Sequence, residues 1–133
     1  MKEVLDSRFF STVFFERETA LRDASRSRLR QLRKEKRGIL PAIVIAEVAN
    51  LICREGGRDL ARAHVRALVA SGLTIAPLDA EIGAAAGLLR CIHRGLPLAD
   101  AVIATIALQE DGCVVSDDPH FEGIKGLRVT WLD

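Results

Sequence analysis

Residues 96–121 read LPLADAVIATIALQEDGCVVSDDPHF, and this stretch decides the fold that the rest of the chain must fit. Its small and branched apolar residues predict a buried helix over residues 98–110. A glycine turn leads into a predicted strand over residues 113–116, which is followed by Asp117 and Asp118. This order of helix, turn, strand and acids is half of a βαβ unit. Because open parallel sheets bind ligands at the carboxyl ends of their strands, we looked for other acids that meet there.

The rest of the chain alternates strands with one or two helices. Further strands are predicted over residues 2–5, 39–40, 73–78 and 127–132, and further helices over residues 8–16, 19–36, 41–55, 59–70 and 80–93. In the helix over residues 59–70 we expect Leu60, Ala63, His64, Ala67 and Leu68 to face inward. The alternation predicts an α/β fold, a three-layer α/β/α sandwich with a central, mostly parallel sheet of four or five strands. We expect one domain over residues 1–133.

Composition excludes several classes of protein. The chain is 49% hydrophobic, but no apolar run approaches the roughly 18 residues of a membrane span. Its start lacks the apolar core of a signal peptide, so we expect a cytoplasmic protein without a membrane partner. The three cysteines have no metal-binding spacing. The sequence has no phosphate-binding GxxxxGK[ST], no GxGxxG and no GxSxG motif.

Positive charge is concentrated in one segment of the chain. Residues 20–37 carry eight basic and two acidic residues, a net +6 in a chain whose total is +1. The predicted helix over residues 19–36 has a narrow apolar stripe, and basic residues cover its other faces. It either holds a polyanion, is an ordinary solvated helix, or docks a protein partner through its stripe. Candidate phosphate contacts on this helix are Arg26, Arg30, Arg33 and Lys34.

Two acids follow predicted strands. Asp6 comes after the first strand, and Asp118 comes after the strand over residues 113–116. If these strands are neighbours, the two carboxylates emerge at the same edge of the sheet. The alternatives are local: Asp6 would cap the next helix, and Asp118 would be a turn acid before proline.

Two further acids lie on predicted helices. Glu47 interrupts an otherwise apolar helix and shares a face with Asn50 and Arg54, at positions i, i+3 and i+7. Asp100 lies in the first turn of its helix. The alternatives are a solvent-facing stripe for Glu47 and a favourable interaction with the helix dipole for Asp100.

Taken together, the four acids predict a metal site. Clustered carboxylates repel one another unless a cation balances them. Oxygen ligands favour Mg²⁺ or Mn²⁺ over zinc, and such ions promote phosphodiester hydrolysis. Of the histidines, only His120 lies near the predicted site, and it either contacts the substrate or orders the loop.

The ordered set of motifs resembles the PIN domain, and in particular the toxin ribonucleases of VapBC type. The matching segments are LDS at residues 5–7, AEV at residues 46–48, LPLADAVIATIAL at residues 96–108 and VSDDPHF at residues 115–121. Together they extend over essentially the whole chain. The sequence departs from the family's pattern at Arg8, Phe9 and Phe10, where smaller or aliphatic residues are common.

The resemblance implies a Mg²⁺- or Mn²⁺-dependent endoribonuclease that acts on RNA, forms a homodimer and is inhibited by a small protein antitoxin. Asp6, Glu47, Asp100 and Asp118 would form the metal and catalytic cluster. Ser116 would steady the cluster through its hydroxyl, with Ser7 and Asp117 in support. The register of the motif favours Asp118 over Asp117 as the ligand. Arg8 either contacts RNA phosphate or points outward.

Two rival functions stay open at this level, and the sequence argues against a third. A non-catalytic RNA-binding or regulatory PIN module would keep the fold without cleavage. A DNA-directed nuclease would use the same acids. A phosphatase that forms a phosphoaspartate would need a second aspartate two positions after Asp6, and Arg8 stands there.

Overall fold

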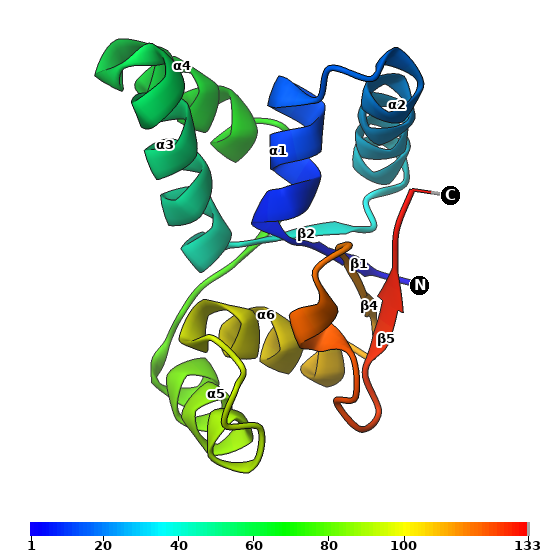
Figure 1. Cartoon of the computed structure of the whole chain (residues 1–133), viewed down its shortest axis with the longest axis vertical. Coiled ribbons are helices and arrows are strands. Elements are labelled where there is room, and N and C mark those ends of the chain that lie inside the picture. Colours follow the sequence, from blue (N-terminus) through cyan, green and yellow to red (C-terminus); the bar gives the residue numbers. More distant parts are fainter. Residues whose placement is uncertain (133) are drawn as a thin grey trace.

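The computed structural model describes residues 1–132. They fold into three layers, a five-stranded sheet with helices on each of its two faces (Figure 1). The strand order is β3-β2-β1-β4-β5, and every pairing is parallel. The strands are short: β1 Glu3–Leu5, β2 Gly38–Pro41, β3 Thr74–Ala76, β4 Cys113–Val115 and β5 Arg128–Thr130. The predicted α/β sandwich is therefore confirmed, with five strands in its sheet.

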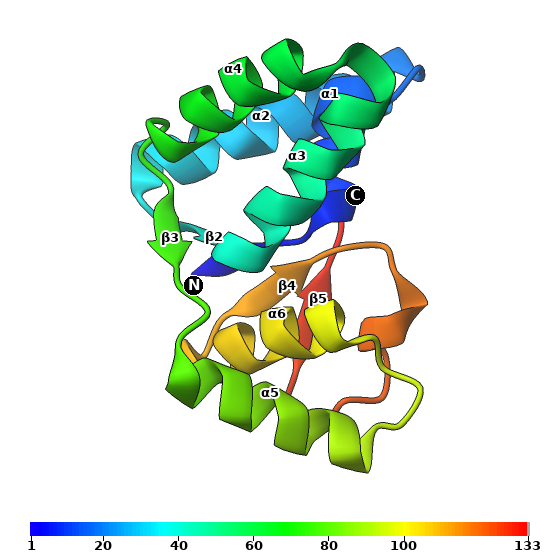
Figure 2. The same ribbon diagram turned by 90° about the vertical axis from the view of Figure 1, so that its left-hand side faces the viewer.

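Six α-helices cover the two faces of the sheet (Figure 2). One layer holds α1 Ser7–Phe15, α2 Thr19–Glu35, α3 Ala42–Gly56 and α4 Arg58–Val69, and the other holds α5 Ala80–Ile92 and α6 Leu98–Gln109. A short 3-10 helix, η1 Pro119–Phe121, follows β4. Within residues 1–132, no helix is both long and apolar enough to cross a membrane.

Local signals explain where the helices begin and end. Asp79 caps α5, and its Oδ1 accepts a hydrogen bond from the Ile82 N–H at 2.9 Å. Lys36 adopts the left-handed conformation at the end of α2, and Gly57, with φ of 90°, separates α3 from α4. Because these signals depend on neighbouring residues alone, the predicted boundaries agree closely with the observed ones.

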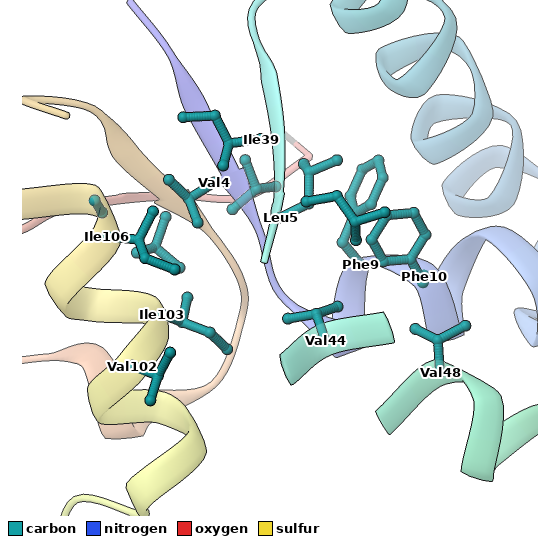
Figure 3. Close-up of a cluster of buried hydrophobic side chains, with 14 of the residues drawn as sticks. Val4, Leu5, Phe9, Phe10, Ile39, Val44, Val48, Val102, Ile103 and Ile106 are labelled. Atoms are coloured by element: carbon teal, nitrogen blue, oxygen red, sulfur yellow. The ribbon is translucent and has the colours of Figure 1, made fainter. Parts of the chain in front are cut away.

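The core lies on both sides of the central strands (Figure 3). Val4 and Leu5 of β1 are fully buried between the two helical layers. The α3 side contributes Val44 and Val48, and the α6 side contributes Ile103. Helix α6 is buried along residues 100–107, since it lies between α5 and the sheet. This packing holds the first turn of α6 against the carboxyl edge of the sheet.

The predicted inward face of α4 is wrong in part. Leu60 is 46% exposed, and Ala63 and Ala67 are also exposed. The buried residues of this helix are Ala61 and Leu68. Helix α4 packs against α3, and this contact buries a face rotated from the expected one.

Candidate metal centre

The carboxyl ends of β1 and β4 place two of the predicted residues side by side. The strands pair in parallel with Leu5 opposite Val115, so Asp6 and Ser116 follow at equivalent positions. Both are buried, with 2% and 3% of their surface exposed. The condition that the two strands be neighbours is therefore met.

Hydrogen bonds fix the orientation of Asp6. Its Oδ1 accepts from the Ser7 N–H at 2.8 Å, which caps α1, and its Oδ2 accepts from the Ser116 hydroxyl at 2.6 Å. The Ser116 oxygen in turn accepts from the Asp118 N–H at 3.0 Å. Ser116 thus joins Asp6 to the loop that carries Asp118. Burial raises the pKa of Asp6 more than these hydrogen bonds lower it.

Asp100 reaches the same edge from the other helical layer. It lies in the first turn of α6 and is 8% exposed. Burial, followed by the negative charge of Asp6, raises the pKa of Asp100 to about 6. A hydrogen bond from His120 partly offsets this rise.

Glu47 approaches from α3. Burial, followed by the charges of Asp6 and Asp100, raises the pKa of Glu47 to about 7. Its Oε1 is buried and, within the described part of the chain, has no hydrogen-bond partner. A buried acceptor without a donor is costly, and a cation next to it would relieve that cost. Electrostatic interactions thus link Asp6 and Asp100 with each other and with both Glu47 and Asp118.

The two adjacent aspartates, Asp117 and Asp118, have different surroundings. Asp117 is exposed and forms an ion pair with Arg8, whose hydrogen bond holds the pKa of Asp117 below its usual value. Asp118 is half-buried, caps η1 and faces Asp100 and His120. Asp118 is therefore the residue that points into the cluster.

His120 is the site residue that the ligand reasoning missed, because that reasoning considered oxygen ligands alone. Its Nδ1 lies 2.9 Å from Asp100 Oδ2 and 3.0 Å from Asp118 Oδ1. One ligand atom from each of these three residues lies within 4.8 Å of the other two. In the sequence, only its position two residues after Asp118 indicated that His120 lies near the site. The direction of its imidazole ring depends on the conformation of η1.

Several basic residues of helix α2 lie away from this site. Arg33 donates to the carbonyl of Ser71, which precedes β3, at 2.8 Å. Arg28 pairs with Glu3, the first residue of β1. The last turn of α2, including Lys34, therefore lies at the amino edge of the sheet, opposite the acids. Arg33 and Lys34 therefore lie away from the acidic cluster, and contact of α2 with RNA stays a prediction.

The other two candidates on α2 form no ion pair with the four acids in the part of the chain that the structure describes. Arg26 donates to the Val13 carbonyl of α1 at 3.0 Å and lines a cavity of about 480 Å³. Arg30 is exposed. Neither forms part of the cluster.

A polar groove begins at the cluster and runs between α1 and α3. Its volume is about 290 Å³, and it is lined by Ser7, Arg8, Ser11, Glu47, Asn50, Leu51 and Arg54. The predicted common face of Glu47, Asn50 and Arg54 is confirmed, since all three line this groove. A larger cavity of about 570 Å³ between α3 and α4 contains none of the four acids. The groove connects the acids with two cations, on Arg8 and Arg54.

Solved structures share this architecture over nearly their whole length. The structure of VapBC2 from Rickettsia felis, bound to a DNA fragment from their promoter, gives a TM-score of 0.77 at 21% identity and covers 100% of both chains. DNA-bound VapBC from Salmonella typhimurium gives 0.76 at 20% identity, covering 100% of this chain and 99% of that one. VapC20 from Mycobacterium tuberculosis, described as a Sarcin-Ricin loop cleaving toxin, gives 0.68 at 16% identity, covering 96% and 99%. These likenesses show the fold.

Sequence comparison shows the family. Curated protein sequences gave no match. The family model of the PIN domain matches residues 4–127, a span that includes every acid of the cluster. The chain therefore belongs to the PIN domain family.

Proposed function

We propose that this chain is a metal-dependent endoribonuclease that hydrolyses RNA phosphodiester bonds and is the toxin of a VapBC-type toxin–antitoxin pair. The observation that carries the proposal is the convergence of Asp6, Glu47, Asp100 and Asp118 at one sheet edge. Within residues 1–132, no lysine or arginine forms an ion pair with Asp6, Glu47 or Asp100. Burial, the largest cause, together with the charges of neighbouring carboxylates raises the pKa of each of these three groups.

The donor set fits Mg²⁺ or Mn²⁺. Asp6, Asp100 and Asp118 supply carboxylate oxygens from three different elements, and the buried Glu47 Oε1 is a further acceptor without a partner. When bound, such an ion stabilises charge on a phosphoryl oxygen and lowers the pKa of water. Ser116 holds Asp6 in the orientation that presents its carboxylate to this position.

Glu47 suits the role of proton acceptor. Burial, followed by the charges of Asp6 and Asp100, raises its pKa to about 7 in the metal-free chain, and its carboxylate lies beside the other acids, where it can accept a proton from an attacking water. Its position on α3, at the start of the polar groove, places it between the other acids and the groove. Glu47 would thus orient the water, while the aspartates would hold the cation.

The polar groove is the best path for the RNA backbone. Arg8 lies at the beginning of α1 and is fixed by Asp117, and Arg54 is exposed at the far part of the groove. Both can contact phosphates next to the scissile one, whereas Arg33 and Lys34 lie at the opposite edge of the sheet. We therefore move the main RNA contacts from the basic helix to the groove.

A protein antitoxin and a second copy of the chain are the proposed partners, and the cytoplasm is the proposed site of action. The antitoxin is supported by the VapBC complexes among the similar structures. An uncovered apolar face on α5 supports contact with another protein, since Leu88 and Ile92 are 70% and 77% exposed.

Cleavage assays with Asp6→Asn and Asp100→Asn test the proposal. Each variant removes one carboxylate without changing side-chain size, and we expect a loss of at least about 10²-fold in metal-dependent RNA cleavage. Asp59→Asn, at a fully exposed position on α4, is the matched control and should cleave normally. Undiminished cleavage by Asp6→Asn and Asp100→Asn would overturn the assignment.

Substrate choice separates the proposal from its rivals. Matched single-stranded RNA and DNA should be compared at the same salt and metal concentration, because electrostatic binding depends strongly on salt. Faster cleavage of RNA supports the proposal, and faster cleavage of DNA identifies a DNA-directed nuclease. Binding of RNA without cleavage at any metal concentration identifies a non-catalytic module.

A further inference from the structure

The imidazole of His120 lies next to two of the four acids, and the proposed function gives it no role. It lies in η1, and its backbone N–H donates to Asp118 Oδ1 at 2.9 Å, which fixes where the imidazole leaves the chain. The ring then reaches across to α6, where Nδ1 meets Asp100 Oδ2 at 2.9 Å. The same Nδ1 lies 3.0 Å from Asp118 Oδ1. One nitrogen thus faces two carboxylates that come from different elements.

These spacings are those of neighbouring ligands around one cation. Ligand atoms about 2.1 Å from an octahedral ion stand about 3 Å apart when they are adjacent. The two measured separations, 2.9 Å and 3.0 Å, agree with two edges of such an octahedron. An ordinary imidazole–carboxylate hydrogen bond has similar lengths, so the distances alone suit both a metal ligand and a charge partner.

The exposure of His120 leaves its ring accessible to an incoming ion. Its side chain is 47% exposed, while that of Asp100 is 11% exposed and that of Asp118 is 19% exposed. The two carboxylates are therefore largely covered by the protein, while the imidazole borders solvent. An ion can enter, and keep water or substrate oxygens, without any movement of the core.

We propose that His120 Nδ1 is a metal ligand together with Asp100 and Asp118, and that this nitrogen makes the site prefer a first-row transition ion such as Mn²⁺ over Mg²⁺. Imidazole binds transition-metal ions strongly. It binds Mg²⁺ weakly, because Mg²⁺ is a hard ion that favours oxygen ligands. The inference rests on the metal-binding part of the proposed function and sharpens it. It replaces the all-oxygen site expected from the sequence with a mixed nitrogen and oxygen site.

Pulsed electron paramagnetic resonance of bound Mn²⁺ tests the ligand directly, without RNA. A coordinated imidazole adds nitrogen modulation to the electron spin echo. We expect this modulation in the native protein and in His93→Gln, whose histidine lies at the end of α5, and we expect it to be lost in His120→Gln. Native protein that binds Mn²⁺ without nitrogen modulation, or that fails to bind Mn²⁺, would overturn the inference.

Titration calorimetry tests the preference between the two ions. His120→Gln should weaken Mn²⁺ binding about tenfold and Mg²⁺ binding by less than about threefold. Equal losses for both ions would show that His120 only orders the loop. Since His120 is exposed, the variant should keep its fold, which thermal unfolding with chelator verifies. These readouts are independent of cleavage, so a protein that shows the nitrogen ligand but leaves RNA intact disproves the proposed function alone.

Discussion

Glu47→Gln should make the metal-free protein more stable above neutral pH, although Glu47 belongs to the proposed active site. Burial next to Asp6 and Asp100 raises the pKa of Glu47 from 4.5 to about 7 in the folded chain. Between pH 4.5 and 7 the folded state therefore keeps a proton that the unfolded state releases. Stability attributable to this group is present below pH 4.5 and is lost as the pH rises through 7. Glutamine has no charge to bury and avoids this loss.

The size of the effect follows from the pKa difference. One pKa unit corresponds to about 1.4 kcal/mol, so the full difference would cost about 3 kcal/mol at pH 8. Glu47 is half-buried, and solvent screening reduces this to about 1–2 kcal/mol. For a chain of this length the gain of the variant corresponds to about 3–6 °C in melting temperature.

Thermal unfolding in chelator at pH 5, 6, 7 and 8 measures the effect. The difference in melting temperature between Glu47→Gln and the native protein should grow with pH across this range. Glu55→Gln, at an exposed position on the same helix, is the matched control and should show no such growth. With saturating Mn²⁺ or Mg²⁺ the order should reverse, since the bound ion favours the native carboxylate.

A Glu47→Gln protein that is equally destabilised at pH 5 and pH 8 would refute the reasoning. That result would mean that the buried Oε1 accepts a hydrogen bond or contacts a cation already, so that ionisation of Glu47 carries no penalty. A gain in stability that persists with saturating metal would separately show that Glu47 lies outside the cation's reach.

Three further outcomes are expected. Ser116→Ala leaves the buried carboxylate of Asp6 with one hydrogen bond fewer, and chemical denaturation should show a loss of about 1–3 kcal/mol together with weaker Mn²⁺ binding. Arg8→Gln should weaken binding of single-stranded RNA and lower the salt dependence by about one phosphate contact, whereas Arg30→Gln should change neither by more than about twofold. Glu3→Gln removes the buried partner of two arginines at the amino edge of the sheet, so the free energy of unfolding should fall by about 2–3 kcal/mol while metal affinity stays unchanged.

Much of the fold was predictable because its signals are local. The cap at Asp79 and the glycine after α3 mark helix boundaries through their own backbone preferences. Alternation of strands and helices then favours parallel pairing, which sends the residues after each strand to the same edge. That rule predicts that Asp6 and Asp118 lie at the same edge of the sheet, and the structure agrees with it.

Other features depended on contacts between distant residues. The sequence could not show that β1 and β4 are neighbours, and the meeting of Asp6 with Ser116 required it. The inward face of α4 was predicted wrongly in part, because packing against α3 buries Ala61 and Leu68 and leaves Leu60 exposed.

The sequence by itself determined the helices and strands, the layered α/β fold and the choice of the four candidate acids. Helix caps, hydrophobic periodicity and strand ends are all signals that lie within short stretches of the chain. The tertiary structure alone decided which groups share the site with those acids. In the folded chain, His120 faces Asp100 and Asp118. Arg8 pairs with Asp117, and Arg33 lies at the opposite edge of the sheet. The physical reason is that charge and ligation act over a few ångströms in space, and distances of that kind are set by packing between elements far apart in the sequence.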